Sequence, residues 1–155
     1  MPTLPKDAQS QIFGGSHGVG FNNVGSYQAS AKPYIKSDID VHMSSSATSD
    51  ATEITFPKVT KFITVQNNST SSNNELRLAF SSGGLGAKAE PGTANNYIKL
   101  AQSASFSADY RVTKIYLMGE SAGCTATVVA GLTQINSSHL PNSWLGDDGV
   151  GGTTP

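Results

Sequence analysis

Charged residues are scarce in this 155-residue sequence. Asp, Glu, Lys and Arg make up 14% of it, whereas they make up about a quarter of an average soluble protein, and the formal net charge is -1. Nucleic acids and anionic membranes attract proteins mainly through clustered basic residues. The sequence therefore predicts neither nucleic acid nor a membrane as a partner.

Cysteine and long apolar runs are also scarce. The single Cys124 has no partner for an intramolecular disulfide and no neighbouring Cys or His for zinc, so we expect it to be a small buried side chain. No apolar run approaches the roughly 18–20 residues of a membrane span, and residues 1–6 lack the apolar stretch of a signal peptide. We expect no targeting segment, no metal and no cofactor.

The sequence does contain short alternations of apolar and polar residues, which are separated by stretches rich in Ser, Asn and Gly. The clearest alternation extends from Ala104 to Val112, where every second residue is apolar. A period of two is typical of a half-buried β-strand. The same pattern predicts seven strands, with an eighth hidden near 38–43: 52–56, 59–66, 75–80, 97–100, 103–108, 112–118 and 125–133.

This order of strands and turns, without a convincing helix, predicts an all-β fold. We expect an antiparallel β-sandwich of the jelly-roll type with seven or eight strands, in which two sheets bury their alternating faces against each other. The predicted core contains the inward-facing apolar residues of these strands: Val59, Ile63, Val65, Leu76, Leu78, Phe80, Phe106, Ile115, Leu117, Val128, Ala130 and Leu132.

Three regions differ in composition. Residues 1–50 are rich in Gly, Ser and Pro without a sustained period, which predicts an extended N-terminal arm. Residues 51–135 form the predicted sandwich domain, and residues 136–155 a loose C-terminal tail. The bulky aromatic residues of the arm and tail are the candidate assembly-interface residues: Phe13, Phe21, Tyr27, Tyr34 and Trp144.

One segment of the sequence matches a catalytic motif. The segment Gly119-Glu-Ser-Ala-Gly123 matches G-x-S-x-G, the nucleophile elbow of α/β-hydrolases. The elbow needs a helix after the serine, then an acid and a histidine; here a β-branched segment follows, and no acid lies between Ser121 and His139. We interpret the motif as a hairpin turn between the last two strands and predict that the protein is not an enzyme.

Four segments together resemble small virion structural proteins of tailed phages and other large DNA viruses. They are Val24-Gly-Ser-Tyr-Gln-Ala-Ser-Ala-Lys-Pro-Tyr34, Ile54-Thr-Phe-Pro-Lys-Val-Thr-Lys-Phe-Ile-Thr-Val65, Leu76-Arg-Leu-Ala-Phe80 and Val128-Val-Ala-Gly-Leu-Thr133. The resemblance implies a jelly-roll subunit located in the virion, of the capsid decoration, vertex or minor capsid type. Its implied partners are further copies of itself, as a homo-oligomer, and other virion structural proteins such as a major capsid protein. No active site comes with it.

A second function remains open at this point. Aromatic residues in the loops of a β-sandwich can stack on sugar rings, and Tyr97, Tyr110, Tyr116 and Trp144 are candidates for that role. On this interpretation the chain is a carbohydrate- or receptor-binding module of a viral tail or fibre, with surface glycans as partners.

Overall fold

The computed structural model describes residues 32–43, 51–85 and 96–137. In these ranges the chain forms eight strands and one 3-10 turn, Gly83–Leu85. The strands are β1 (Lys32–Val41), β2 (Thr52–Thr55), β3 (Lys58–Asn67), β4 (Leu76–Ala79), β5 (Ile98–Leu100), β6 (Ser105–Ala108), β7 (Lys114–Gly119) and β8 (Cys124–Asn136).

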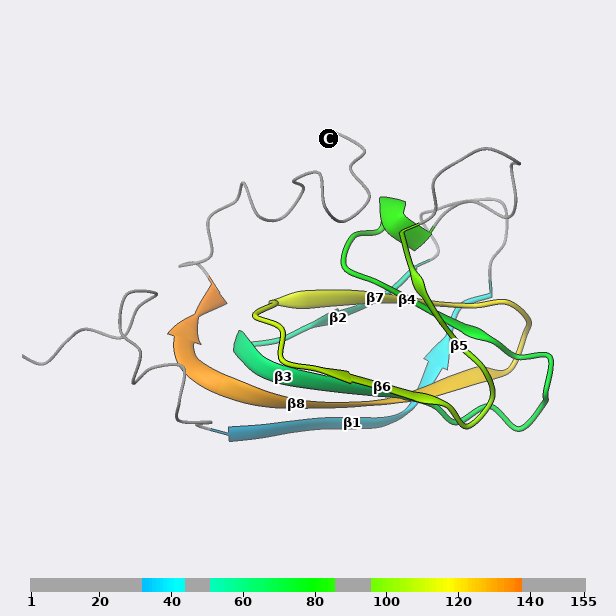
Figure 1. The fold of residues 1–155 in the computed structure, drawn as a ribbon, viewed down its shortest axis with the longest axis horizontal. Coiled ribbons are helices and arrows are strands. Elements are labelled where there is room, and N and C mark those ends of the chain that lie inside the picture. Colours follow the sequence, from blue (N-terminus) through cyan, green and yellow to red (C-terminus); the bar gives the residue numbers. More distant parts are fainter. Residues whose placement is uncertain (1–31, 44–50, 86–95, 138–155) are drawn as a thin grey trace, which may run out of the picture.

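The strands form two four-stranded sheets stacked as two layers (Figure 1). Sheet A has the order β1-β8-β3-β6, and sheet B has the order β2-β7-β4-β5. The antiparallel pairs β1–β8 and β3–β6 lie in sheet A, while β2–β7 and β4–β5 lie in sheet B. Strands β1 to β4 thus pair in reverse order with strands β8 to β5, as in one long folded hairpin. Successive pairs along this hairpin alternate between sheet A and sheet B. This is the jelly-roll arrangement, and it confirms the predicted fold.

All seven predicted ranges contain a strand, and the hidden eighth strand exists. It is β1, which begins at Lys32 rather than near Asp38 and pairs with β8 along the edge of sheet A. The sandwich therefore includes residues 32–41, which lie in the range that the sequence assigned to the arm. The sequence missed this strand start because Lys32-Pro-Tyr-Ile-Lys36 shows only a weak alternation.

The core lies between the two layers. Ten of the twelve predicted core residues are buried, and the other two, Phe80 and Phe106, are partly buried and pack against the same cluster. Cys124 is fully buried, as predicted. Burying one large apolar side chain stabilises a fold by about 1.5–3 kcal/mol, so this core is the main stabilising element.

Two segments whose composition predicts hairpin turns, the Ser- and Asn-rich stretch 67–74 and the motif 119–123, are corners between the sheets. Residues 68–75 lead from β3 in sheet A to β4 in sheet B, and residues 120–123 lead from β7 in sheet B to β8 in sheet A. Sequence composition marks a turn, but it does not tell whether the next strand joins the same sheet. The hairpin interpretation was therefore wrong for both.

A buried hydrogen-bond network holds these two corners together. The side-chain amide of Asn67 donates to the main-chain oxygens of Asn74 (2.8 Å) and Leu100 (3.1 Å). Its side-chain oxygen accepts from the N–H (3.0 Å) and the hydroxyl (2.6 Å) of Ser69. The hydroxyl of Ser69 in turn accepts from the N–H of Thr125 (3.1 Å), at the start of β8.

Candidate functional site: an uncharged sheet face

The central part of the outward face of sheet A is built from three rows of residues in cross-strand register, and Asp40 and Thr125 lie beyond them at one end. The central row is Ile35, Val129, Thr64 and Ser107, which crosses all four strands. The rows on either side complete what we call the uncharged face: Pro33, Ile35, Phe62, Thr64, Gln66, Ser105, Ser107, Thr127, Val129 and Gly131. Their sequence neighbours Ile63, Val65, Val128 and Ala130 are buried, so alternation points these residues outward.

The uncharged face is apolar at its centre. Ile35 is 65% exposed, the largest exposed fraction among the big apolar residues that the structure describes. Val129 lies beside it on β8, and Phe62 lies one row away on β3. A solvated sheet face normally carries polar residues in alternation with the core. An outward Ile–Val–Phe group surrounded by hydroxyl groups is instead typical of a surface that another protein covers.

The other outer surface of the sandwich differs in charge. Four ion pairs involve residues of sheet B and its corner: Arg77–Glu120 (2.8 Å), Lys99–Glu75 (2.5 Å), Lys99–Glu120 (3.8 Å) and Lys114–Glu53 (2.7 Å). The hydrogen bond from Lys114 lowers the pKa of Glu53, and the same bond raises the pKa of Lys114. Both carboxylate and ammonium groups therefore stay charged at neutral pH.

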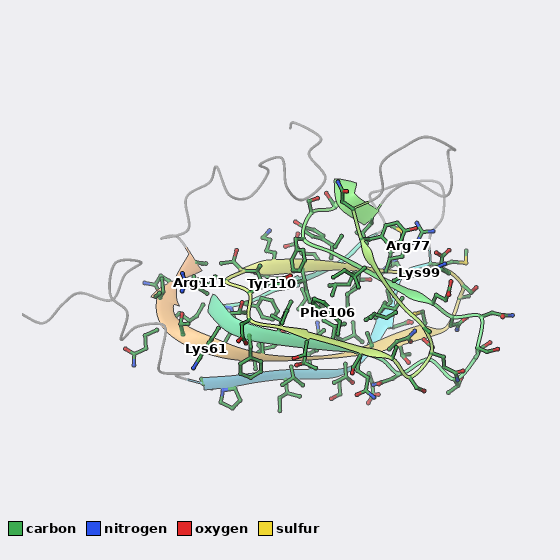
Figure 2. The ribbon with its side chains drawn as sticks, in the orientation of Figure 1. Lys61, Arg77, Lys99, Phe106, Tyr110 and Arg111 are labelled. Carbon is green, nitrogen blue, oxygen red and sulfur yellow. The ribbon has the colours of Figure 1, made fainter. Side chains whose placement is uncertain are left out.

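Arg77 is the one buried member of this group, with 5% of its surface exposed. Its Nε donates to Glu120 (2.8 Å) and its Nη1 to the main-chain oxygen of Leu85 (3.1 Å), while the guanidinium lies 4.7 Å from the centre of the Tyr97 ring. Leu85 itself packs in a small second core with Ala79 and Met118. Figure 2 shows Arg77 and Lys99 close together at this end of the sandwich. Arg77 thus fixes the 3-10 turn on sheet B.

An aromatic cluster lies beside the main core. The Phe80 and Tyr110 rings meet edge to face, with centroids 5.3 Å apart, and Phe106 lies 6.2 Å from Tyr110 (Figure 2). Tyr110 is 45% exposed. The Thr60 hydroxyl donates to the main-chain oxygen of Tyr110 (2.6 Å) and accepts from the N–H of Val112 (3.0 Å), which fixes the backbone that presents the ring.

Of the five predicted interface residues, the structure describes Tyr34 alone. Tyr34 lies in β1, where its ring meets Phe56 edge to face at 5.1 Å and packs against the core. Phe13, Phe21, Tyr27 and Trp144 lie outside the described residues. The sequence did not single out Ile35, the neighbour of Tyr34. The outward direction of Ile35 follows from its exposure in the folded chain and from the inward direction of Tyr34.

The serine of the G-x-S-x-G motif lies at the corner before β8. Its hydroxyl donates to the main-chain oxygen of Asn73 (3.4 Å), and a strand follows it where the nucleophile elbow has a helix. Across residues 32–43, 51–85 and 96–137, no three His, Cys, Asp or Glu side chains gather as a metal site, and no helix is long and apolar enough to span a bilayer.

The two sheets and their strand order place the protein in the class of jelly-roll β-sandwiches. Comparison with known proteins found no matching family model, no matching curated protein and no matching solved structure. Function must therefore be inferred from the residues of this chain.

Proposed function

We propose that this chain is a non-enzymatic structural subunit of a virus particle, a capsid-associated protein of the decoration, vertex or minor capsid type. It assembles with copies of itself and with other virion proteins, such as a major capsid protein. The observation that carries the proposal is an eight-stranded jelly roll in which ten adjoining register positions on the outward side of sheet A carry no charge. Viral capsid subunits are among the proteins that use this architecture.

Architecture alone does not separate a capsid subunit from a lectin or a cupin, because one fold serves many functions. The surface supplies the distinction. Ten register positions without a charge favour a protein that is covered on one side, since the core of a protein interface is depleted of charged residues. The aromatic residues Phe13, Phe21 and Tyr27 stay predictions for a second contact, through the N-terminal arm.

The direct test is quantitative mass spectrometry of purified particles from the virus that carries this sequence. A shell or decoration subunit is expected in tens to hundreds of copies per particle, and a vertex subunit in fewer. Absence of the protein from particles that are otherwise complete would refute the proposal.

A truncation tests the arm separately. Removing residues 1–31 keeps all eight strands in the chain, because β1 begins at Lys32. We expect the truncated chain to keep its circular dichroism spectrum and to lose binding to particles. Unchanged binding to particles would contradict the role of the arm.

A second candidate function rests on the cluster of Phe80, Phe106 and Tyr110. A half-exposed aromatic ring on a fixed backbone is suited to stacking on a sugar, and this favours the carbohydrate-binding alternative. A glycan array with the full chain is the test. Tyr110→Phe should retain binding and Tyr110→Ala should lose it, whereas a Tyr110→Ala variant that binds as well as the unaltered chain would exclude this site.

A further inference from the structure

The chain places its charges unevenly over its two outer surfaces. The ten positions of the uncharged face carry no ionisable side chain, and Asp40, which pairs with Thr125 beyond the row of Thr127, is a charged residue at one end of the same side of sheet A. Sheet B and its corner instead carry the ion pairs of Glu53, Arg77, Lys99 and Lys114. A surface exposed to water gains from charge, and a surface that meets another protein loses free energy by desolvating it. The distribution therefore orients the molecule, with sheet B towards solvent and sheet A towards a partner.

The chemistry of the uncharged face fits a second copy of the same face. In a two-fold contact each residue near the axis meets residues of its own set, so identical charges would repel. A hydroxyl both donates and accepts, and it can therefore pair with the same group on another copy. The hydroxyl oxygens of Thr64 and Ser107 lie 2.8 Å apart in a hydrogen bond in which either hydroxyl can be the donor. Ile35 and Val129 supply apolar surface that needs no polar partner.

The β1 edge of sheet A offers a poorer contact than the face of the sheet. Edge strand β1 carries Pro33, which has no N–H to donate, and exposed lysines at 32 and 36. Its pairing with β8 is also interrupted between Lys36 and Ile39, where Asp38 has a φ of 53°. Proline, lysine and bulges are the features by which sheet edges avoid pairing with another chain. Strand addition at β1 is thus disfavoured.

The size of the face sets the strength of the contact. Four strands about 4.8 Å apart and three rows of residues about 6.8 Å apart give roughly 400 Å² of projected area. A stable dimer buries about 800 Å² on each partner. A contact of half that size is weak, so two isolated molecules should associate only at the upper end of a series of protein concentrations, and it suits a subunit that several neighbours hold at once.

We propose that two copies of this chain contact each other face to face through the uncharged face, with sheet B of each copy turned to solvent. The inference rests on the proposed function as an assembling subunit, for which it names the partner and the surface. It accounts together for the missing charges, the exposed Ile35 and the modified edge of β1.

Charge reversal at one central position tests the contact. Val129→Lys places a lysine on both sides of a two-fold contact, and Val129→Glu places a glutamate there. We expect sedimentation velocity of the full chain, over a series of concentrations, to show self-association weakened at least tenfold in each variant. An equimolar mixture of the two variants should associate again, because a lysine then faces a glutamate.

The matched control is Ser72→Lys, which adds the same charge at an exposed turn away from both faces. It should leave self-association unchanged, and thermal unfolding of each variant verifies that it is folded. If Val129→Lys does not fold, Ile35→Lys makes the same test at a position that is 65% exposed.

Three results would overturn the proposal: a monomer at every concentration, equal weakening by Ser72→Lys, or no recovery in the mixture. Failure here is distinct from failure of the proposed function. Copies of the protein in purified particles without self-association would leave the particle role standing and remove the face-to-face contact. Self-association without copies in particles would do the reverse.

Discussion

The buried amide of Asn67 gives the sharpest prediction about stability. Asn67 has no exposed surface, and its side chain makes four hydrogen bonds to three residues at the end of the sandwich where both corners meet. Replacing it in the variant Asn67→Ala removes all four bonds. The carbonyls of Asn74 and Leu100 and the N–H of Ser69 then lose this partner within a buried region.

The expected cost follows from these groups. A buried polar group left without a partner costs about 1–3 kcal/mol, and water entering the space of the amide recovers part of the loss. For three main-chain groups we expect Asn67→Ala to lower the free energy of unfolding by about 3–5 kcal/mol. Because small domains are stable by only about 5–15 kcal/mol, this is a large fraction of the total.

Urea unfolding followed by far-ultraviolet circular dichroism measures the loss, provided that the dependence on urea stays the same. The neighbouring Asn68→Ala is the matched control. The Asn68 amide makes one hydrogen bond, to the Thr127 hydroxyl at 2.6 Å in a partly buried position, so we expect a cost of about 1 kcal/mol. Equal costs for the two variants would refute the view that the Asn67 network holds the corners.

Three further predictions concern acid stability, thiol reactivity and backbone geometry. Because Lys114 lowers the pKa of Glu53, the ion pair stabilises the fold above about pH 4.5, and this stabilisation is lost as the pH falls through the lowered pKa of Glu53 in the folded protein. Glu53→Gln should therefore make the melting temperature less dependent on pH in the acid range. An unchanged dependence would contradict this. Burial raises the pKa of the Cys124 thiol, so Ellman's reagent should modify it rapidly only in urea; rapid modification of the native protein would show that the thiol is accessible. Gly119→Ala should destabilise more than Gly123→Ala, because a Cβ on Gly119 would lie 2.6 Å from the Cβ of Cys124, whereas Gly123 has a φ of 78° that costs alanine about 1–2 kcal/mol. Urea unfolding compares the two, and the reverse order would contradict the clash.

Much of the fold could be predicted because strand formation is encoded locally. The period of two in segments such as 59–66 and 125–133 places alternate residues on opposite faces of the chain, whatever the strand pairs with. The buried state of Cys124 followed from the same alternation. The clearest alternation was less informative, since β6 ends at Ala108 and Tyr110 lies in a loop.

The candidate site could not be predicted, because a surface is assembled from strands that are distant in the sequence. Ile35, Val129, Thr64 and Ser107 come from four strands, and only the cross-strand register aligns them in one row. The sequence pointed instead to aromatic residues, of which Tyr34 packs against the core. Aromatic side chains suit both interfaces and cores, so residue type alone did not separate the two roles.

The sequence by itself determined that this chain forms short strands with loops between them, a buried cysteine and few charges, because period, turn residues and composition act over a few neighbouring residues. The tertiary structure decided which strands share a sheet, that the two predicted hairpin turns are corners, and that ten adjoining positions on the outward side of sheet A carry no charge. Those properties depend on pairing between the two ends of the chain, such as β1 with β8, and no local pattern specifies a partner about ninety residues away.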